Sequence, residues 1–318
     1  MGGASKIIWP IEDLHIDQEY GLTAIRAKDE NRCVLRIGNE VKDYALKSVD
    51  LKTKNLTLLD EVFDLLAQKE FQYYSPIVRS IHGEFFIKRQ SGTYYLAEWI
   101  AGRESNFSSY HDLLNCTRTL AKMHLLTSGF RARAIDWKER WSSSVQKLLA
   151  LESSYTLHPP LALLVRRAIE AGEKTLRLLD DPEVNQSLYN PTVVCHHDLS
   201  YRNFIINPDD QAFLIDFDYA TADVPMRDLA QFFIKVLKHN NWDINVILPL
   251  ISAYKQENTL SRGDLGVMIA FLSFPRSLWG LNSGIQECIT PKEIIKSYLK
   301  NTARQFAVSS LMQHFSFE

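Results

Sequence analysis

The chain contains few cysteines, and they are scattered. Cys33, Cys116, Cys195 and Cys288 include no Cys-x-x-Cys pair. Closely spaced cysteines are typical of zinc sites and of disulfide frameworks, so the sequence predicts neither. We expect these residues to be reduced thiols of the protein core.

Long apolar runs are also lacking. No stretch approaches the length of a membrane span, and the N-terminal segment shows no signal-peptide apolar region. The start Met1-Gly2-x-x-x-Lys6 has Lys where a myristoylation signal has Ser or Thr. These absences predict a cytosolic protein that has no membrane partner.

Neither sign of charge is in large excess. Lys and Arg total 36 against 38 Asp and Glu, which gives a net charge of −2. We therefore expect no nucleic-acid partner and no attraction to a membrane surface. The 318 residues, 46% of them hydrophobic and 23% charged, are enough for two lobes with a large core. No internal repeat is evident.

A predicted β-hairpin lies at the centre of the chemistry. Apolar runs at Phe204–Ile206 and Ala212–Ile215 flank a Pro-Asp-Asp turn, as expected of two buried strands. A His-His-Asp-Leu-x-x-x-Asn loop with Asp198 and Asn203 precedes the first strand, and Asp216 ends the second. The hairpin is therefore predicted to hold these three side chains close together.

This set of side chains suits phosphoryl transfer. The reaction needs hard oxygen ligands for Mg²⁺ and a carboxylate that orients or deprotonates the attacking hydroxyl. Asn203 and Asp216 would bind the metal, and Asp198 would hold the hydroxyl. The alternative is a buried hairpin with incidental acids in its loops.

The same motifs carry a resemblance to a known fold. Asp198-x-x-x-x-Asn203 followed by Asp216 resembles the catalytic loop and the metal-binding Asp of the protein-kinase-like fold. Ile-Asp216-Phe-Asp218, in place of Asp-Phe-Gly, is similar to the aminoglycoside phosphotransferase and choline kinase group. This resemblance implies ATP and Mg²⁺ as cofactors, with Asp218 assisting the metal or the substrate.

The resemblance also implies an α+β, bilobal protein kinase-like fold. Its N-lobe, residues 1–101, would be a small antiparallel β-sheet with one main helix that binds the nucleotide. Its C-lobe, residues 102–318, would be mainly helical and contain the catalytic loop, the metal site and the substrate-binding helices. Alternating apolar residues predict three antiparallel strands at the start of the N-lobe, over residues 22–28, 33–37 and 43–49.

The nucleotide site of the N-lobe is expected at Lys47. Tyr-Ala-Leu-Lys47 resembles the third kinase strand, whose Lys reaches the α- and β-phosphates. An apolar stripe from Leu58 to Leu66 predicts a helix, with Thr57 as its start signal. We place Glu61 beside this stripe as the partner of Lys47. Glu70 and a merely solvated Glu61 are the alternatives.

The segment from Glu98 to Gly102 resembles the hinge between the lobes of these kinases. Backbone groups around Glu98 and Ile100 would hydrogen-bond adenine, and Gly102 would permit the turn into the next lobe. The alternative is an ordinary strand end. A hinge reads purines largely through backbone atoms, so both ATP and GTP remain open as donors.

The C-lobe is expected to be mainly helical. Periodicity predicts helices over residues 110–125, 161–179, 225–236, 244–256, 262–274 and 291–312. The resemblance assigns His196 and Asp228 to the support of the catalytic loop. His124 lies on an apolar helix face, and we expect it to be a hydrogen-bonded core residue without a chemical role.

A protein substrate is not expected. The short stretch between Asp216 and Asp228 leaves no room for a protein-kinase activation loop. His197 also replaces the Arg that would pair with an activation-loop phosphate. The acceptor is therefore predicted to be a hydroxyl of a small polar metabolite, of the sugar or amino alcohol type.

Further motifs resemble the CotS-type spore-coat proteins of endospore-forming bacteria. They are Val-Pro-Met-Arg-Asp228-Leu and Phe271-Leu-Ser-Phe-Pro-Arg-Ser-Leu-Trp279. The resemblance implies a place in the mother-cell cytosol or the spore coat, with other spore-coat proteins as partners.

Two functions therefore stay open. The first is a small-molecule phosphotransferase, favoured by Lys47, Asp198, Asn203 and Asp216 occurring together. The second is a non-catalytic structural coat protein that keeps the kinase-like fold. It is favoured by the turn Lys28–Cys33, which has no glycine to let backbone amides approach a phosphate.

Overall fold

A computed structural model provides the structure of the chain. It describes residues 14–22, 26–31, 34–49, 55–131, 135–154, 159–189, 191–275 and 291–317, with backbone only at 29, 31, 154, 160 and 291–301. Part of the turn Lys28–Cys33 lies outside these residues, as do Trp279 and Cys288. Cys116 and Cys195 are buried free thiols, as expected.

Contacts divide the chain into two compact units. The first comprises Met1–Ser105 together with Tyr201–Thr221, and the second comprises Asn106–Ser200 together with Ala222–Glu318. The break after Ser105 lies close to the boundary expected at Gly102. The expected division into an N-lobe of residues 1–101 and a C-lobe of residues 102–318 stays a prediction. Packing groups the central hairpin with the first unit, whereas the prediction counts it with the C-lobe.

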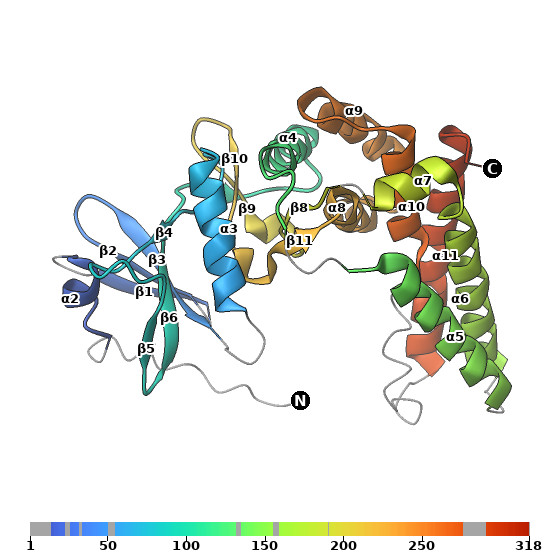
Figure 1. The fold of residues 1–318 in the computed structure, drawn as a ribbon, viewed down its shortest axis with the longest axis horizontal. Coiled ribbons are helices and arrows are strands. Elements are labelled where there is room, and N and C mark those ends of the chain that lie inside the picture. Colours follow the sequence, from blue (N-terminus) through green and yellow to red (C-terminus); the bar gives the residue numbers. More distant parts are fainter. Residues whose placement is uncertain are drawn as a thin grey trace. The chain divides into compact units, whose positions relative to one another are not determined.

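The first unit contains a six-stranded antiparallel sheet (Figure 1). Its strand order is β1-β2-β3-β6-β4, and β5 pairs with β6. The strands are β1 Arg26–Asn31, β2 Val34–Gly38, β3 Asp43–Val49, β4 Ile77–Val78, β5 Ile87–Arg89 and β6 Gly92–Glu98. A short helix, α2 (Ile16–Tyr20), precedes them. The antiparallel N-terminal sheet confirms the predicted fold class.

Strand β1 extends further along the chain than predicted. We expected the first strand to end at Lys28, but pairing with β2 continues to Asn31, with an irregularity between Asp29 and Asn31. Pairing with β2 therefore extends the first strand into the segment that its polar residues had marked as a turn.

One helix, α3 (Leu56–Gln68), accompanies this sheet (Figure 1). Its first turn is capped by Asn55, whose side chain accepts a hydrogen bond from the Leu58 N–H at 3.2 Å, and not by the expected Thr57. The helix buries Leu56, Leu59, Val62, Phe63 and Leu66. Each such side chain contributes about 1.5–3 kcal/mol through burial.

The predicted central hairpin is present. Strands β9 (Phe204–Ile206) and β10 (Ala212–Leu214) pair antiparallel, and β7 (Arg103–Glu104) pairs with the outer edge of β9. Gly102, with φ of 153°, lies directly before β7, and a Cβ there would come within 2.2 Å of the Ile206 carbonyl oxygen. Only glycine permits this close approach of the two backbones.

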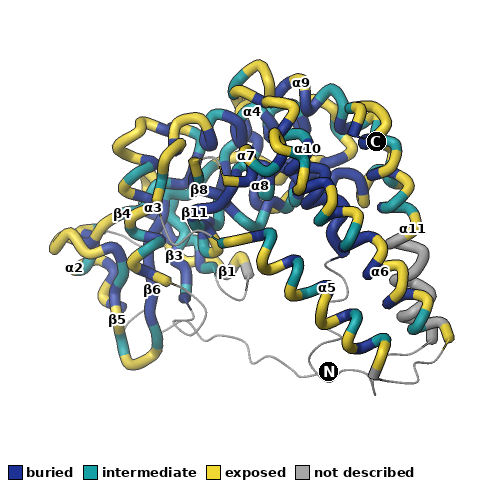
Figure 2. The backbone as a smooth tube through the Cα atoms, turned by 45° about the vertical axis from the view of Figure 1, so that its right-hand side comes forward, coloured by how far each residue is buried: buried dark blue, intermediate teal, exposed yellow. Residues whose placement is uncertain are grey.

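The second unit is mainly helical, as predicted. Figure 2 shows the alternation of buried and exposed residues along its helices, with an extended buried run in α10. Two short strands, β8 (Val193–Cys195) and β11 (Thr221–Asp223), pair with each other. The helices are α4 Tyr110–Leu126, α5 Trp137–Ser154, α6 Pro159–Leu178, α7 Pro182–Leu188, α8 Pro225–His239, α9 Leu248–Glu257, α10 Arg262–Ser273 and α11 Pro291–His314.

Two of these helices, α5 and α7, were not predicted. The short α7 begins at Pro182, and the Asp181 side chain caps it by accepting hydrogen bonds from the N–H groups of Glu183 and Val184. No helix in the described ranges combines the length and the apolar character needed to cross a membrane.

Candidate functional site

A buried lysine meets two carboxylates in the first unit. The Lys47 ammonium nitrogen on β3 lies 2.5 Å from Oδ1 of Asp216 and 3.2 Å from Oδ1 of Asp218. Tyr95, the partner of Lys47 in the β3–β6 register, donates its hydroxyl to Oδ1 of Asp218 at 2.6 Å. The structure thus brings the predicted phosphate-binding Lys together with two predicted metal ligands.

The charges of this cluster follow from its surroundings. Burial acts to lower the pKa of Lys47, but Tyr95, Asp218 and Asp216 outweigh it and raise that pKa well above its usual value. Burial, helped by Asp218, raises the pKa of Tyr95 in spite of the nearby Lys47. At neutral pH Lys47 is therefore a cation and Tyr95 a neutral hydrogen-bond donor.

The residues at the end of the hairpin fit a divalent cation. Asp216 and Asp218 converge on one positively charged atom, the Lys47 nitrogen, so both carboxylates can face a single cation. Asn203 is buried at the end of a 3₁₀ turn (Tyr201–Asn203), and its carbonyl accepts a hydrogen bond from Ile215 at 3.0 Å. Two carboxylates and an amide oxygen are hard ligands of the kind that Mg²⁺ prefers.

Backbone strain marks the same place. Asp216 has a φ of 67°, in the left-handed region that non-glycine residues rarely adopt. Such conformations persist where the surrounding structure fixes them, and they cluster at functional sites. Asp216 lies two residues after the end of β10, at the start of a 3₁₀ turn, Phe217–Tyr219.

Glu61 does not pair with Lys47 in this structure. It is exposed on α3, and the described carboxylates at Lys47 are Asp216 and Asp218. We had centred the apolar face of the helix too far toward Leu58 and Leu65. The buried face is centred on Leu59, Val62, Phe63 and Leu66, and at 100° per residue Glu61 lies on the opposite side.

Glu98 and Ile100, the two residues named for the predicted hinge, differ in their backbone hydrogen bonds. The Glu98 N–H donates to the Pro76 carbonyl at 2.8 Å, and the Glu98 carbonyl accepts a hydrogen bond from the Ser75 hydroxyl at 2.6 Å. Its carboxylate pairs with Lys42. No described residue hydrogen-bonds the backbone of Ile100. Ile100 is therefore better placed than Glu98 to contact an adenine ring.

The loop that carries Asp198 lies in the second unit and is held from α8. The buried Asp228 carboxylate accepts hydrogen bonds from the N–H groups of His196 at 2.5 Å and His197 at 2.9 Å. The Asp198 N–H donates to Nδ1 of His196 at 3.2 Å. The structure thus brings His196 and Asp228 to the backbone around Asp198, where we expected them to support the loop.

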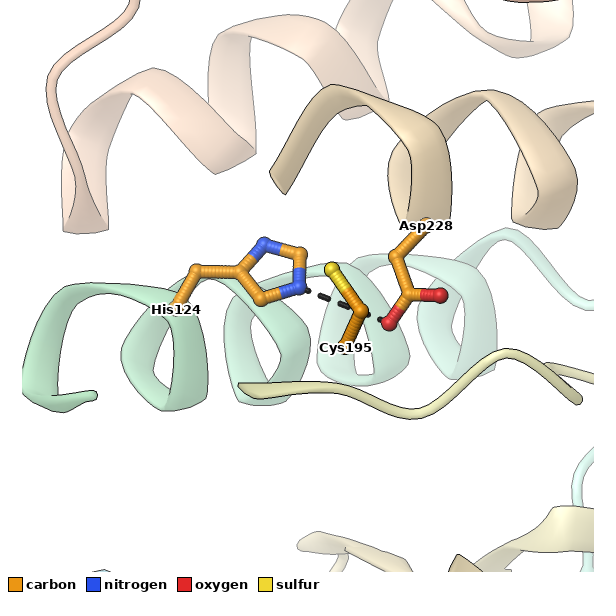
Figure 3. A group of neighbouring side chains, drawn as sticks. All are labelled: His124, Cys195 and Asp228. Atoms are coloured by element: carbon orange, nitrogen blue, oxygen red, sulfur yellow. Dashed lines mark ion pairs between the residues drawn. The ribbon is translucent and has the colours of Figure 1, made fainter. Parts of the chain in front are cut away.

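Asp228 is charged in spite of complete burial. Burial acts to raise its pKa, but the neighbouring His124, His197 and His196 outweigh this and lower the pKa below its usual value. Figure 3 shows one of these neighbours, with Nε2 of His124 at 3.6 Å from Oδ2 of Asp228. The other ring nitrogen of His124 lies 2.9 Å from the Tyr254 hydroxyl, so His124 is a hydrogen-bonded core residue, as predicted.

The group in Figure 3 does not fit a metal, although His124, Cys195 and Asp228 lie close together. Burial raises the pKa of the Cys195 thiol well above its usual value, and the thiol donates to the Val224 carbonyl at 3.4 Å. Both oxygens of Asp228 already accept backbone hydrogen bonds. The trio instead supports the catalytic loop from inside the core.

Sequence reasoning missed two further contacts of this loop. Lys235 Nζ lies 2.8 Å from Oδ1 of Asp198, and Gln231 Nε2 donates to the His197 carbonyl at 2.6 Å. Their spacing from Asp228 along the predicted helix could have revealed both, because residues three and seven apart share one helix face.

Asp223 is a third side chain that contacts this loop and that sequence reasoning missed. It is buried, accepts a hydrogen bond from Trp137 Nε1 at 2.7 Å, and lies 3.3 Å from both His197 Nε2 and Arg227 Nε. Its contacts make it an anchor for His197, next to Asp198.

The fold and the site together are those of a kinase-like phosphotransferase. The expected motif residues are present in its two units. The chain matches the model of the phosphotransferase enzyme family over residues 21–265, and it belongs to that family.

Solved structures show the same fold. An aminoglycoside phosphotransferase from Alicyclobacillus acidocaldarius is similar with a TM-score of 0.80 at 18% identity, over 99% of this chain and 98% of the other. The choline kinase LicA from Streptococcus pneumoniae gives a TM-score of 0.58 at 16% identity, over 94% and 98%. The amicoumacin kinase hAmiN, solved with AMP-PNP and Ca²⁺, gives 0.64 at 14% identity, over 94% and 93%.

Proposed function

We propose that the protein is a Mg²⁺- and ATP-dependent phosphotransferase that acts on a hydroxyl of a small polar metabolite. The observation that carries the proposal is the convergence of Asp216 and Asp218 on Lys47. Two carboxylates for a metal and a cation for phosphates, on a fold of the phosphotransferase family, are the groups that this reaction requires.

Each motif residue has a proposed role. Asn203, Asp216 and Asp218 would hold Mg²⁺, which neutralises phosphate charge when bound. Lys47 would contact the phosphates, and the Ile100 backbone would contact adenine. Asp198 would accept a hydrogen bond from the acceptor hydroxyl and so orient its oxygen, while His196 and Asp228 keep the loop in place.

The acceptor is proposed to be of the sugar or amino alcohol type. The similar structures include an aminoglycoside phosphotransferase and a choline kinase, whose names indicate hydroxyl-bearing metabolites. A finer proposal is a CotS-type protein of the mother cell or the spore coat with other coat proteins as partners. It rests on the sequence motifs alone, and imaging a tagged chain during sporulation would test it.

A non-catalytic coat protein is the second candidate. The observation that favours it is the same ion pair, because the Lys47 ammonium occupies the two carboxylates that a metal would need. In an enzyme, Mg²⁺ would take the place of Lys47 at the two carboxylates, and the nucleotide phosphates would take the place of the carboxylates at Lys47. In a structural protein the pair would stay closed.

Thermal unfolding with and without MgATP separates the two candidates. A ligand at about 100 times its Kd stabilises the folded state by about 2.7 kcal/mol, or roughly 4 °C in Tm for a chain of this size. We expect a Mg²⁺-dependent shift that Asp216→Ala abolishes. Asp180→Ala, at an exposed Asp paired with Lys138, is the matched control and should keep the shift. A well-folded wild type without any shift would overturn the enzyme proposal.

A further inference from the structure

One face of α8 contacts consecutive residues of the loop around Asp198. Asp228 accepts the N–H groups of His196 and His197, Gln231 donates to the His197 carbonyl, and Lys235 contacts the Asp198 carboxylate. Positions three and seven after Asp228 lie on the same side of the helix. A single rigid element therefore holds the loop from its backbone to its proposed catalytic side chain.

The backbone beside Asp198 is strained, and α8 holds it. His197 has a φ of 64°, in the left-handed region that is unfavourable for a non-glycine residue. Its N–H and its carbonyl are both bonded to α8 side chains, and its ring lies 3.3 Å from Asp223. Such strain persists where surrounding contacts fix it. The loop therefore has one imposed conformation.

We propose that Lys235 is a positioning residue that fixes the Asp198 carboxylate for the acceptor hydroxyl. This inference rests on the proposed function. The contacts of Asp228 and Gln231 act on the loop backbone. Lys235 contacts the Asp198 carboxylate itself, at 2.8 Å.

Because this ion pair is partly exposed, its effect on the position of Asp198 can be measured apart from its effect on folding stability. The Lys235 side chain is 30% exposed and that of Asp198 is 40% exposed. Solvent screens such pairs, so they contribute little to folding stability. Loss of Lys235 should therefore leave the fold nearly unchanged. A carboxylate that moves by about 1 Å can nonetheless slow a reaction about a hundredfold.

Kinetics of MgATP hydrolysis, with water as the acceptor, test the proposal on the full chain. We expect Lys235→Met to lower kcat about tenfold or more, with KM for ATP within about twofold of the wild type. Lys235→Arg should restore part of kcat, because it keeps the positive charge. Lys255→Met, at an exposed lysine of α9 in the same unit, is the control and should have the wild-type kcat. A wild-type kcat in Lys235→Met would overturn the proposal.

Crystal structures of the wild type and Lys235→Met give a second test that needs no turnover. We expect the Asp198 carboxylate to change its torsions in the variant while the 196–198 backbone stays in place. An unmoved carboxylate would overturn the inference. A wild type that neither binds nor hydrolyses MgATP would instead overturn the proposed function, and the structural comparison would still decide whether Lys235 positions Asp198.

Discussion

The Lys47 ammonium lies 2.5 Å from the Asp216 carboxylate, although the two residues are 169 positions apart in the chain. The pair connects β3 to the end of the central hairpin within the first unit. The same contact is thus a link between two distant segments and the core of the proposed nucleotide site.

Lys47→Met should therefore affect both stability and binding. It leaves the Asp216 and Asp218 carboxylates facing each other without the ammonium, and we expect a loss of about 2 kcal/mol in the free energy of unfolding. The MgATP-dependent rise in Tm should also disappear. Urea unfolding and thermal shifts measure the two effects. Lys88→Met, at an exposed lysine of β5 in the same unit, should behave like the wild type. Equal stability of both variants would contradict the prediction.

Asp228→Asn should destabilise the chain at neutral pH. The new amide group would face the backbone N–H donors of His196 and His197, and we expect a loss of about 3 kcal/mol. The folded state lowers the Asp228 pKa, so the stabilisation is present above the ordinary value of 3.8 and is lost as the pH falls below it. The difference between variant and wild type should therefore narrow below about pH 4 in urea unfolding. A stability difference between variant and wild type that does not change with pH would refute this explanation.

Tyr20→Phe should be neutral or stabilising by up to about 1 kcal/mol at pH 7. The buried Tyr20 hydroxyl makes no hydrogen bond of normal geometry with the described residues and only approaches the Leu96 backbone, so its removal loses little. Burial raises the pKa of Tyr20 above its ordinary 10.0, so the folded state keeps a proton that the unfolded chain loses, and stability falls as the pH rises past 10.

The variant should therefore lose less stability between about pH 9 and 11, as measured by urea unfolding. Tyr110→Phe, at an exposed tyrosine, is the control and should keep the alkaline loss of the wild type. An alkaline loss in Tyr20→Phe as large as in the wild type would argue against this contribution.

Gly102→Ala should lower the Tm more than Gly83→Ala. Both glycines have positive φ, but an added Cβ at Gly102 would lie 2.2 Å from the Ile206 carbonyl oxygen, whereas at Gly83 it would meet nothing within 4 Å. The difference isolates the steric clash and should cost about 1–3 kcal/mol. Indistinguishable Tm values would show that the β7–β9 approach can relax.

Local patterns were enough to predict much of the fold. Two short apolar runs and a Pro-Asp-Asp turn predicted the β9–β10 hairpin, because both features act over a few residues. Helical periodicity predicted α4, α8 and α10. The expected helix face of α3 was wrong, because Leu58 and Leu65 are only partly buried. The apolar side that becomes the core is decided by tertiary partners, such as the Tyr74, Phe85 and Phe217 rings that contact Phe63.

The contacts of the candidate site were harder to predict. The motif spacing named Asp198, Asn203 and Asp216, but it carries no information on partners far along the chain, such as Lys235 for Asp198. The identity of the carboxylates at Lys47 likewise depends on how β3 meets the hairpin. Such pairings follow from tertiary packing, which a single sequence does not state.

The first unit is discontinuous in the sequence, because Tyr201–Thr221 completes it. A ribosome must therefore synthesise the helices from α4 to α7 before β7 can acquire β9 and before Lys47 can acquire Asp216. Synthesis order and folding order consequently cannot coincide for this unit, unlike the usual case in which N-terminal domains fold first. A fragment that stops at Ser105 would expose the edge of β7 and a buried lysine without its carboxylates, and it would need the hairpin supplied as a second chain.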